Sequence, residues 1–288
     1  MMARKIPRQP VVILKSSWNT LISHPAIIFP FCIVAFLQFL ALEVLFFAHR
    51  YPLNKFFAPL ILRFNSEAYM HYPYNFILLV KWFLALQPVM FVLVHSFFIG
   101  AAVIVINHIN NDRPVHMRSI FRETRRHYGK LFLSFAIALG SLMLIFRGLD
   151  SLPLHNMIPA VLMKGAAGEI IRQNGVALLK LLGNIVVTIL FIYMVPALVV
   201  SEKNLFSALI MNFKCLVRSA GFVIAVVVLT SLLYVPVILL LQNGEIFQGV
   251  YPEAWMWILI FYVLVTLMIE AVQYTTITVY YLLMKDFG

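Results

Sequence analysis

The side chains best suited to chemistry lie inside long apolar runs of this chain. Glu270 follows Trp257 by 13 residues, a distance of about 20 Å along a helix that rises 1.5 Å per residue. Gln273 follows Glu270 within one turn, and His95 lies at a similar depth in another apolar run. An ionisable group at such a depth in a bilayer costs at least about 2.5 kcal/mol on insertion scales. Each of these residues therefore needs a partner or a function.

Two interpretations of this polar set are open. Glu270 and His95 form a proton-binding or substrate-binding pair inside a helix bundle, or they are hydrogen-bonding groups that hold neighbouring helices together. The second role usually contributes about 1 kcal/mol or less. We favour the structural role, because one acid and one imidazole do not make a pathway by themselves.

Local catalytic motifs are missing from the sequence. We find no HExxH, no GxSxG, no glycine-rich phosphate loop and no paired acidic motif. The eight histidines show no i, i+4 pairing, which is the spacing that lets one helix present two metal ligands. We therefore expect no enzymatic activity, no cofactor and no metal site.

Composition determines the class of protein. The chain has 288 residues, of which 62% are hydrophobic and 11% charged, and its mean hydropathy is +0.94. Such a chain is an integral membrane protein rather than a soluble domain. Its 22 Lys and Arg against 11 Asp and Glu indicate contact with anionic phospholipids. Nucleic acid is not an expected partner, because the chain has no soluble segment large enough to bind it.

Six apolar segments approach or exceed the roughly 20 residues needed to cross about 30 Å of hydrocarbon. We predict an all-α protein with a single polytopic membrane domain over residues 1–288. Pro88, Pro196 and Pro236 lie within or at the ends of segments and should kink them. The predicted spans are about Ala26–Ala48, Leu84–Ile106, Leu131–Phe146, Leu178–Val200, Gly221–Leu241 and Trp257–Leu283.

Before three of these spans the sequence has a basic segment with helical spacing of its apolar residues. The pattern predicts three repeated units, each an interfacial amphipathic helix followed by a hairpin of two spans, over about residues 7–106, 114–200 and 203–285. The basic side chains of the second and third segments are candidates for binding lipid headgroups or an acidic partner. They are Arg118, Arg122, Arg125, Arg126, Lys203, Lys214 and Arg218.

The distribution of Lys and Arg between loops predicts the orientation. These residues concentrate at the two chain ends and in the loops around Arg122 and Lys214. Because short cytoplasmic loops carry an excess of positive charge, we expect both termini in the cytoplasm.

Several short strings resemble a widespread bacterial membrane family. They are the stretch from Pro196 through Glu202 into Ala208 and Leu209, the basic run that ends at Gly221, and LKSSWNTLISHP near the start. The family includes the six-span domain attached to some glycerophosphodiester phosphodiesterases and the YciC-like inner-membrane proteins. The resemblance implies a six-helix domain in the bacterial cytoplasmic (inner) membrane and no active site, because the phosphodiesterase activity of the fused relatives resides in a separate soluble barrel.

Three classes of function remain. The leading hypothesis is a non-catalytic membrane subunit that anchors or organises a larger envelope assembly or local lipid, with a protein partner in the membrane. The alternative is a small permease or lipid-handling transporter that uses the bundle interior, for which Glu270 and His95 would be the relevant residues. An intramembrane enzyme comes third.

Overall fold

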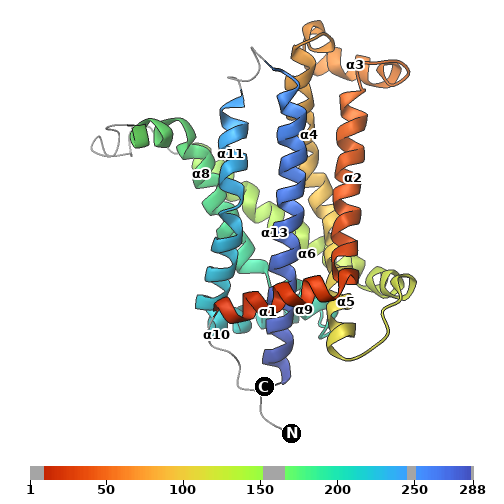
Figure 1. Cartoon of the computed structure of the whole chain (residues 1–288), viewed down its shortest axis with the longest axis vertical. Helices are drawn as coiled ribbons and strands as arrows, with labels where there is room; N and C mark the ends of the chain where they lie inside the picture. Colours follow the sequence, from red (N-terminus) through yellow and green to blue (C-terminus); the bar gives the residue numbers. More distant parts are fainter. Residues whose placement is uncertain (1–9, 152–165, 245–250, 287–288) are drawn as a thin grey trace.

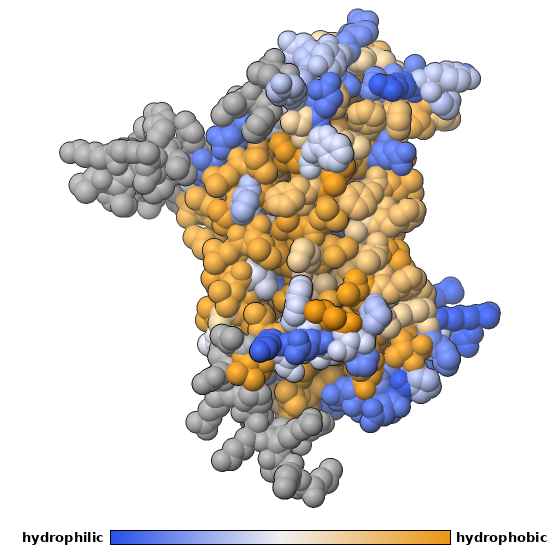
Figure 2. All heavy atoms as spheres, in the orientation of Figure 1, coloured by the Kyte–Doolittle hydropathy of each residue, from blue (hydrophilic) through white to orange (hydrophobic). Residues whose placement is uncertain are grey.

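The computed structural model describes residues 10–151, 166–244 and 251–286, and these residues form helices joined by turns, with no strand among them. Six helical segments are long and apolar enough to cross a membrane, so the prediction of an all-helical chain with six candidate spans is confirmed. Figure 2 shows an apolar belt across the visible face of the bundle, with hydrophilic surface at both ends. This is the arrangement of a multi-pass membrane protein.

The candidate spans are built from one helix each or from helices in series. They are Pro25–Phe46 (η1, Pro25–Ile27, and α2, Ile28–Phe46), Tyr74–Asn110 (α4, Tyr74–Met90, η3, Phe91–His95, and α5, Ser96–Asn110), Met117–Ser151 (α6), Asn174–Val199 (α8, Ala166–Phe191, and α9, Met194–Val199), Leu205–Ser231 (α10) and Ala254–Lys285 (α13, Ala254–Asp286). A shorter helix, α11 (Tyr234–Gln242), continues from α10.

Two helices lie at the ends of this bundle. Figure 1 shows α1 (Pro10–Ser23) crossing the bundle at the end where α13 finishes, and α3 (Asn54–Phe64) at the opposite end. Helix α1 packs against α13 and α10. We refer to these as the α1 end and the α3 end of the bundle.

Three predicted boundaries differ from the structure. The fifth predicted span, Gly221–Leu241, is divided between α10, which ends at Ser231, and α11, and α10 has non-helical backbone at Ser219 near the predicted start. The second span starts at Tyr74 instead of Leu84. Lys81 therefore lies within α4, and its ammonium group donates to the Asn65 side chain 3.0 Å away. In addition, α6 is one continuous helix of 35 residues, although the sequence pattern predicts an interfacial helix followed by a separate span. No proline lies within α6 to break it.

The three intramembrane prolines lie beside irregular backbone, as predicted. Pro88 near the end of α4 precedes the π-helical turn η3. Pro196 lies in α9 directly after the break from α8, and Pro236 lies in the first turn of α11 directly after the break from α10. Proline has no N–H and its ring clashes with the carbonyl four residues earlier, which fits its place beside a break or a widened turn.

The break between α8 and α9 is satisfied by a side chain from another helix. Asn212 of α10 is fully buried, accepts a hydrogen bond from the Tyr193 backbone N–H at 3.0 Å and donates one to the Leu190 carbonyl at 2.6 Å. Backbone groups inside a bilayer have no water to bond to. Asn212 therefore replaces the bonds that the interrupted helix lacks.

The central element of the bundle is α5. It packs against α2, α6, α9 and α13, and its side chains from Ile99 to Ile106 are all at most 2% exposed. Gly100 allows the close approach of α6, because a Cβ atom there would lie 2.5 Å from the Leu131 side chain. This packing fixes the position of the π-helical turn that immediately precedes α5.

Candidate functional site

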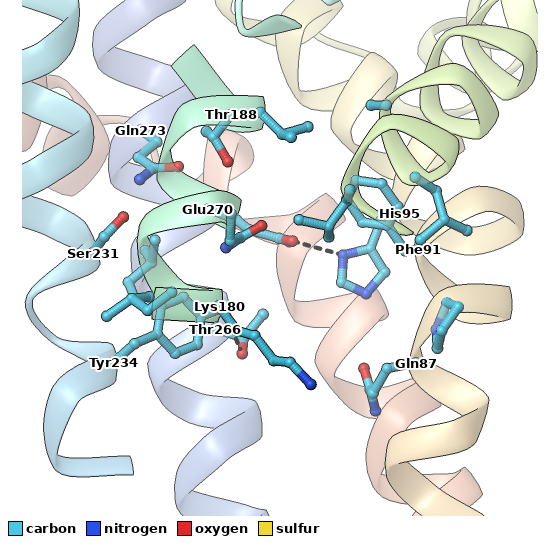
Figure 3. A pocket seen from close by; sticks show the side chains of 18 of the residues that line it. Gln87, Phe91, His95, Lys180, Thr188, Ser231, Tyr234, Thr266, Glu270 and Gln273 are labelled. Atoms are coloured by element: carbon cyan, nitrogen blue, oxygen red, sulfur yellow. Dashed lines mark hydrogen bonds and ion pairs between the residues drawn. The ribbon is translucent and has the colours of Figure 1, made fainter. Parts of the chain in front are cut away.

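The structure brings Glu270 and His95 into direct contact. His95 Nδ1 and Glu270 Oε1 are 2.7 Å apart, and the two side chains are 4% and 14% exposed. Figure 3 shows the pair spanning the space between α13 and the turn that carries Phe91 and His95. Widening a helix into a π turn redirects the side chains that follow it. Pro88 and the π turn thus place His95 opposite the carboxylate.

Two glutamines extend the pair into a chain of four polar side chains. Gln38 of α2, which is 1% exposed, has its Nε2 atom 3.0 Å from His95 Nε2 and 3.0 Å from Gln87 Oε1. The sequence analysis did not single out Gln38 or Gln87. The rule applied to Glu270 would have found both, because each is an isolated polar residue in an apolar run.

A cavity of about 570 Å³ adjoins this chain of polar groups. On α13 it extends from Tyr262 to Tyr274, which is about 18 Å of helix. Aromatic rings make up much of its wall, and hydroxyl and amide groups lie between them. The rings are those of Phe91, Phe135, Phe146, Phe191, Tyr234, Tyr262 and Tyr274, and the polar side chains other than the Glu270 pair include Gln87, Ser134, Asn184, Thr188, Ser231, Thr266 and Gln273.

Two glutamine side chains in this wall differ in their hydrogen bonding. Gln273 donates to the Thr230 hydroxyl at 2.6 Å and so links α13 to α10. Gln87 has its Nε2 atom buried with no hydrogen-bond partner among the described residues. A buried donor without a partner costs about 1–3 kcal/mol, so the Gln87 amide is free to bond to a guest in the cavity.

A second ion pair lies in the wall formed by α6 and α8. Lys180 Nζ is 2.8 Å from Asp150 Oδ1 and lies 5.7 Å from the centre of the Phe146 ring. Both partners are partly exposed, at 35% and 55%. This ion pair connects the last turn of α6 to α8.

The basic residues predicted to bind lipid do not line this cavity. They are exposed side chains on the first half of α6, on α10 and on the turn before α10. Figure 2 shows hydrophilic surface where Figure 1 places the start of α6, below the apolar belt. The exposed residues are Arg118, Arg122, Arg125, Arg126, Lys203, Lys214 and Arg218.

No known relative supplies a function. No protein-family model, curated protein or solved structure matches the chain. Within the described ranges, no group of three or more His, Cys, Asp or Glu side chains is placed to hold a metal ion. Functional inference therefore depends on the cavity and on the exposed basic surface.

Proposed function

We propose that this protein is a small permease or lipid-handling transporter that binds an amphiphilic molecule in the cavity beside Glu270. The cavity itself carries the proposal. A bundle that only anchors other proteins has no use for a half-open cavity of about 570 Å³ that places polar side chains at membrane depth, where such groups are costly. The size matches that of typical small-molecule sites, and so does a mostly apolar wall with a few polar groups.

Two substitutions on one helix test this proposal. Ala138 of α6 lines the cavity and is 9% exposed, whereas the neighbouring Ile137 is 42% exposed on the outside of the bundle. We expect Ala138→Phe to fill the cavity and to reduce binding of the neutral dye 1-N-phenylnaphthylamine by at least about tenfold. Ile137→Phe should leave binding unchanged. Fluorescence titration of purified protein in nanodiscs makes the measurement, and equal binding by both variants would contradict the proposal.

A second candidate function is a non-catalytic subunit that anchors an envelope assembly or local lipid. The exposed arginines on the first half of α6 favour it, because they face the region where anionic headgroups would lie. The two candidates are compatible, since the arginines and the cavity occupy different parts of the molecule.

For orientation, we propose that the α1 end faces the cytoplasm of a bacterial inner membrane, with both termini there. The exposed arginines at the start of α6 support this, since cytoplasmic loops are rich in Lys and Arg. The relation among the three predicted units rests on the sequence pattern alone. A cysteine introduced at Ser119 should resist an impermeant thiol reagent added to intact cells, and labelling there would reverse the orientation.

A further inference from the structure

Few charged side chains among the described residues line the cavity, and they differ in their partners. Among the described residues that line the cavity, Glu270 is the only acid and Lys180 is the only Lys or Arg. Lys180 already has a carboxylate partner, because Asp150 lies 2.8 Å away. The interior is thus left with the carboxylate of Glu270, whose charge depends on what His95 carries.

The His95 ring has a polar partner at each nitrogen. Gln38 Nε2 lies 3.0 Å from His95 Nε2 and 3.0 Å from Gln87 Oε1, and Glu270 Oε1 lies 2.7 Å from His95 Nδ1. A neutral ring that has its proton on Nδ1 fits both contacts, because it donates to the carboxylate and accepts from the Gln38 amide. With such a ring beside an ionised Glu270, the pair carries one negative charge.

A charge at this depth requires neutralisation. The first way is to add a proton at His95 Nε2, in which case Gln38 must rotate its amide so that its oxygen accepts from the ring. The second way is to place a cation in the cavity beside Glu270. Since burial of an isolated charge in a bilayer costs at least about 2.5 kcal/mol, either the proton or the cation should be present.

The cavity wall suits a cation that carries apolar groups. The ring of Phe91 packs near two other rings, with its centre 6.1 Å from that of His95 and 4.9 Å from that of Phe135. Tyr234 and Tyr262 line the same space. Aromatic faces attract ammonium and related cations most strongly where water is excluded, and they also bury hydrocarbon.

We infer that the ligand of this cavity is a cationic amphiphile, which enters in exchange for one proton held by the Glu270–His95 pair. The inference rests on the proposed function, since it names the ligand of that same site. One positive charge leaves as a proton and one arrives with the ligand, so the charge of the cavity does not change. The other ionisable groups that line the cavity are Tyr234 of α11, Tyr262 and Tyr274 of α13, and Lys180 of α8 with its partner Asp150 of α6.

Two probes of matched shape and opposite charge test the inference. Tetraphenylphosphonium is a lipophilic cation and tetraphenylborate is its anionic counterpart. We expect purified protein in nanodiscs to bind the cation, to release about one proton per cation in weakly buffered solution, and to bind more tightly by up to about tenfold per pH unit as pH rises. The anion should bind at least about tenfold more weakly than the cation.

A pair of acid-to-amide substitutions provides the control. Glu270→Gln should lower cation affinity at least about tenfold and abolish proton release. Glu43→Gln removes an exposed acid near the end of α2 that does not line the cavity, and it should change neither quantity. Unaltered binding of neutral 1-N-phenylnaphthylamine by Glu270→Gln will show that the variant is folded with its cavity intact.

The outcomes separate this inference from the proposed function. Equal binding of cation and anion, or cation binding without proton release, would overturn the exchange, while dye binding that Ala138→Phe blocks would still support a ligand site. If Ala138→Phe blocks the binding of neither the dye nor the cation, both proposals fail.

Discussion

The helical segments on the two sides of the cavity differ in how firmly the rest of the bundle holds them. In the segment Tyr74–Asn110, which contains His95 and α5, 61% of the most apolar 18-residue stretch is buried. The corresponding share is 22% for α6 and 22% for Asn174–Val199, which contains most of α8. Most residues of this stretch are therefore buried in the first segment, whereas most are not buried in the corresponding stretches of α6 and of Asn174–Val199.

The polar side chains of the site and the side chains of the less buried wall come from different helices. Glu270, His95 and Gln87 belong to α13 and to the firmly packed segment, whereas α6 and α8 supply side chains such as Phe135 and Thr188. Regions with few buried contacts open at lower free energy than a core. We therefore expect the polar groups to keep their geometry while α6 and α8 move to admit a ligand.

The largest loss of unfolding free energy should come from a substitution at the break between α8 and α9. Asn212→Leu removes both hydrogen bonds that replace the helical bonds at the break between α8 and α9. The Tyr193 N–H and the Leu190 carbonyl then lack these partners in an apolar interior, so we expect a loss of about 2–4 kcal/mol of unfolding free energy. SDS titration in mixed micelles measures this loss. A loss below about 1 kcal/mol would show that the break does not depend on Asn212.

Substitutions at two glycines compare how much stability depends on packing at each side of the cavity. Gly100→Leu should lower the unfolding free energy by about 1–3 kcal/mol, because its Cβ would meet the fully buried Leu131 at 2.5 Å. Gly183→Leu should cost less than about 1 kcal/mol, since the nearest atom, 2.9 Å away, belongs to the half-buried Ile145 of α6. The same SDS titration compares the variants.

A third glycine gives the control for this comparison. No atom lies within 4 Å of a Cβ placed at Gly140, so Gly140→Leu should not destabilise the protein. Equal losses at Gly100 and Gly183 would contradict the proposed difference between the firmly packed segment and the α6–α8 side.

The smallest effect on stability should come from the exposed face of α6. Changing Arg122 and Arg126 together to Glu should alter the unfolding free energy by less than about 0.5 kcal/mol, because both are exposed. It should nevertheless reduce the anionic lipid that native mass spectrometry finds on the protein. Charge reversal of Arg50 and Arg63, near the α3 end, is the control. Unchanged lipid retention would remove the support for the anchoring function.

Several features of the fold were predictable because membrane physics leaves few alternatives. Long apolar runs must satisfy their backbone bonds internally and so become helices, and prolines must disturb them. The boundaries were less accurate. The predicted second span began after Lys81, but an ammonium group that finds a partner such as Asn65 can remain on a helix. The continuous α6 was missed because an amphipathic pattern does not reveal whether a helix bends at its end.

The amino-acid pattern alone identifies the apolar segments of the chain and the side chains within them that are too polar for a bilayer without a partner or a function. Glu270 and His95 are identified by depth alone, since the cost of desolvating them depends on the bilayer and not on their neighbours. Contacts between residues that are far apart in the sequence depend on the tertiary structure. Residues 38, 87, 95 and 270 form one hydrogen-bonded chain only because α2, the π turn after Pro88 and α13 pack together. The cavity likewise exists only where α6 and α8 leave space beside that chain, because a void is a property of how several helices pack and no single helix encodes it.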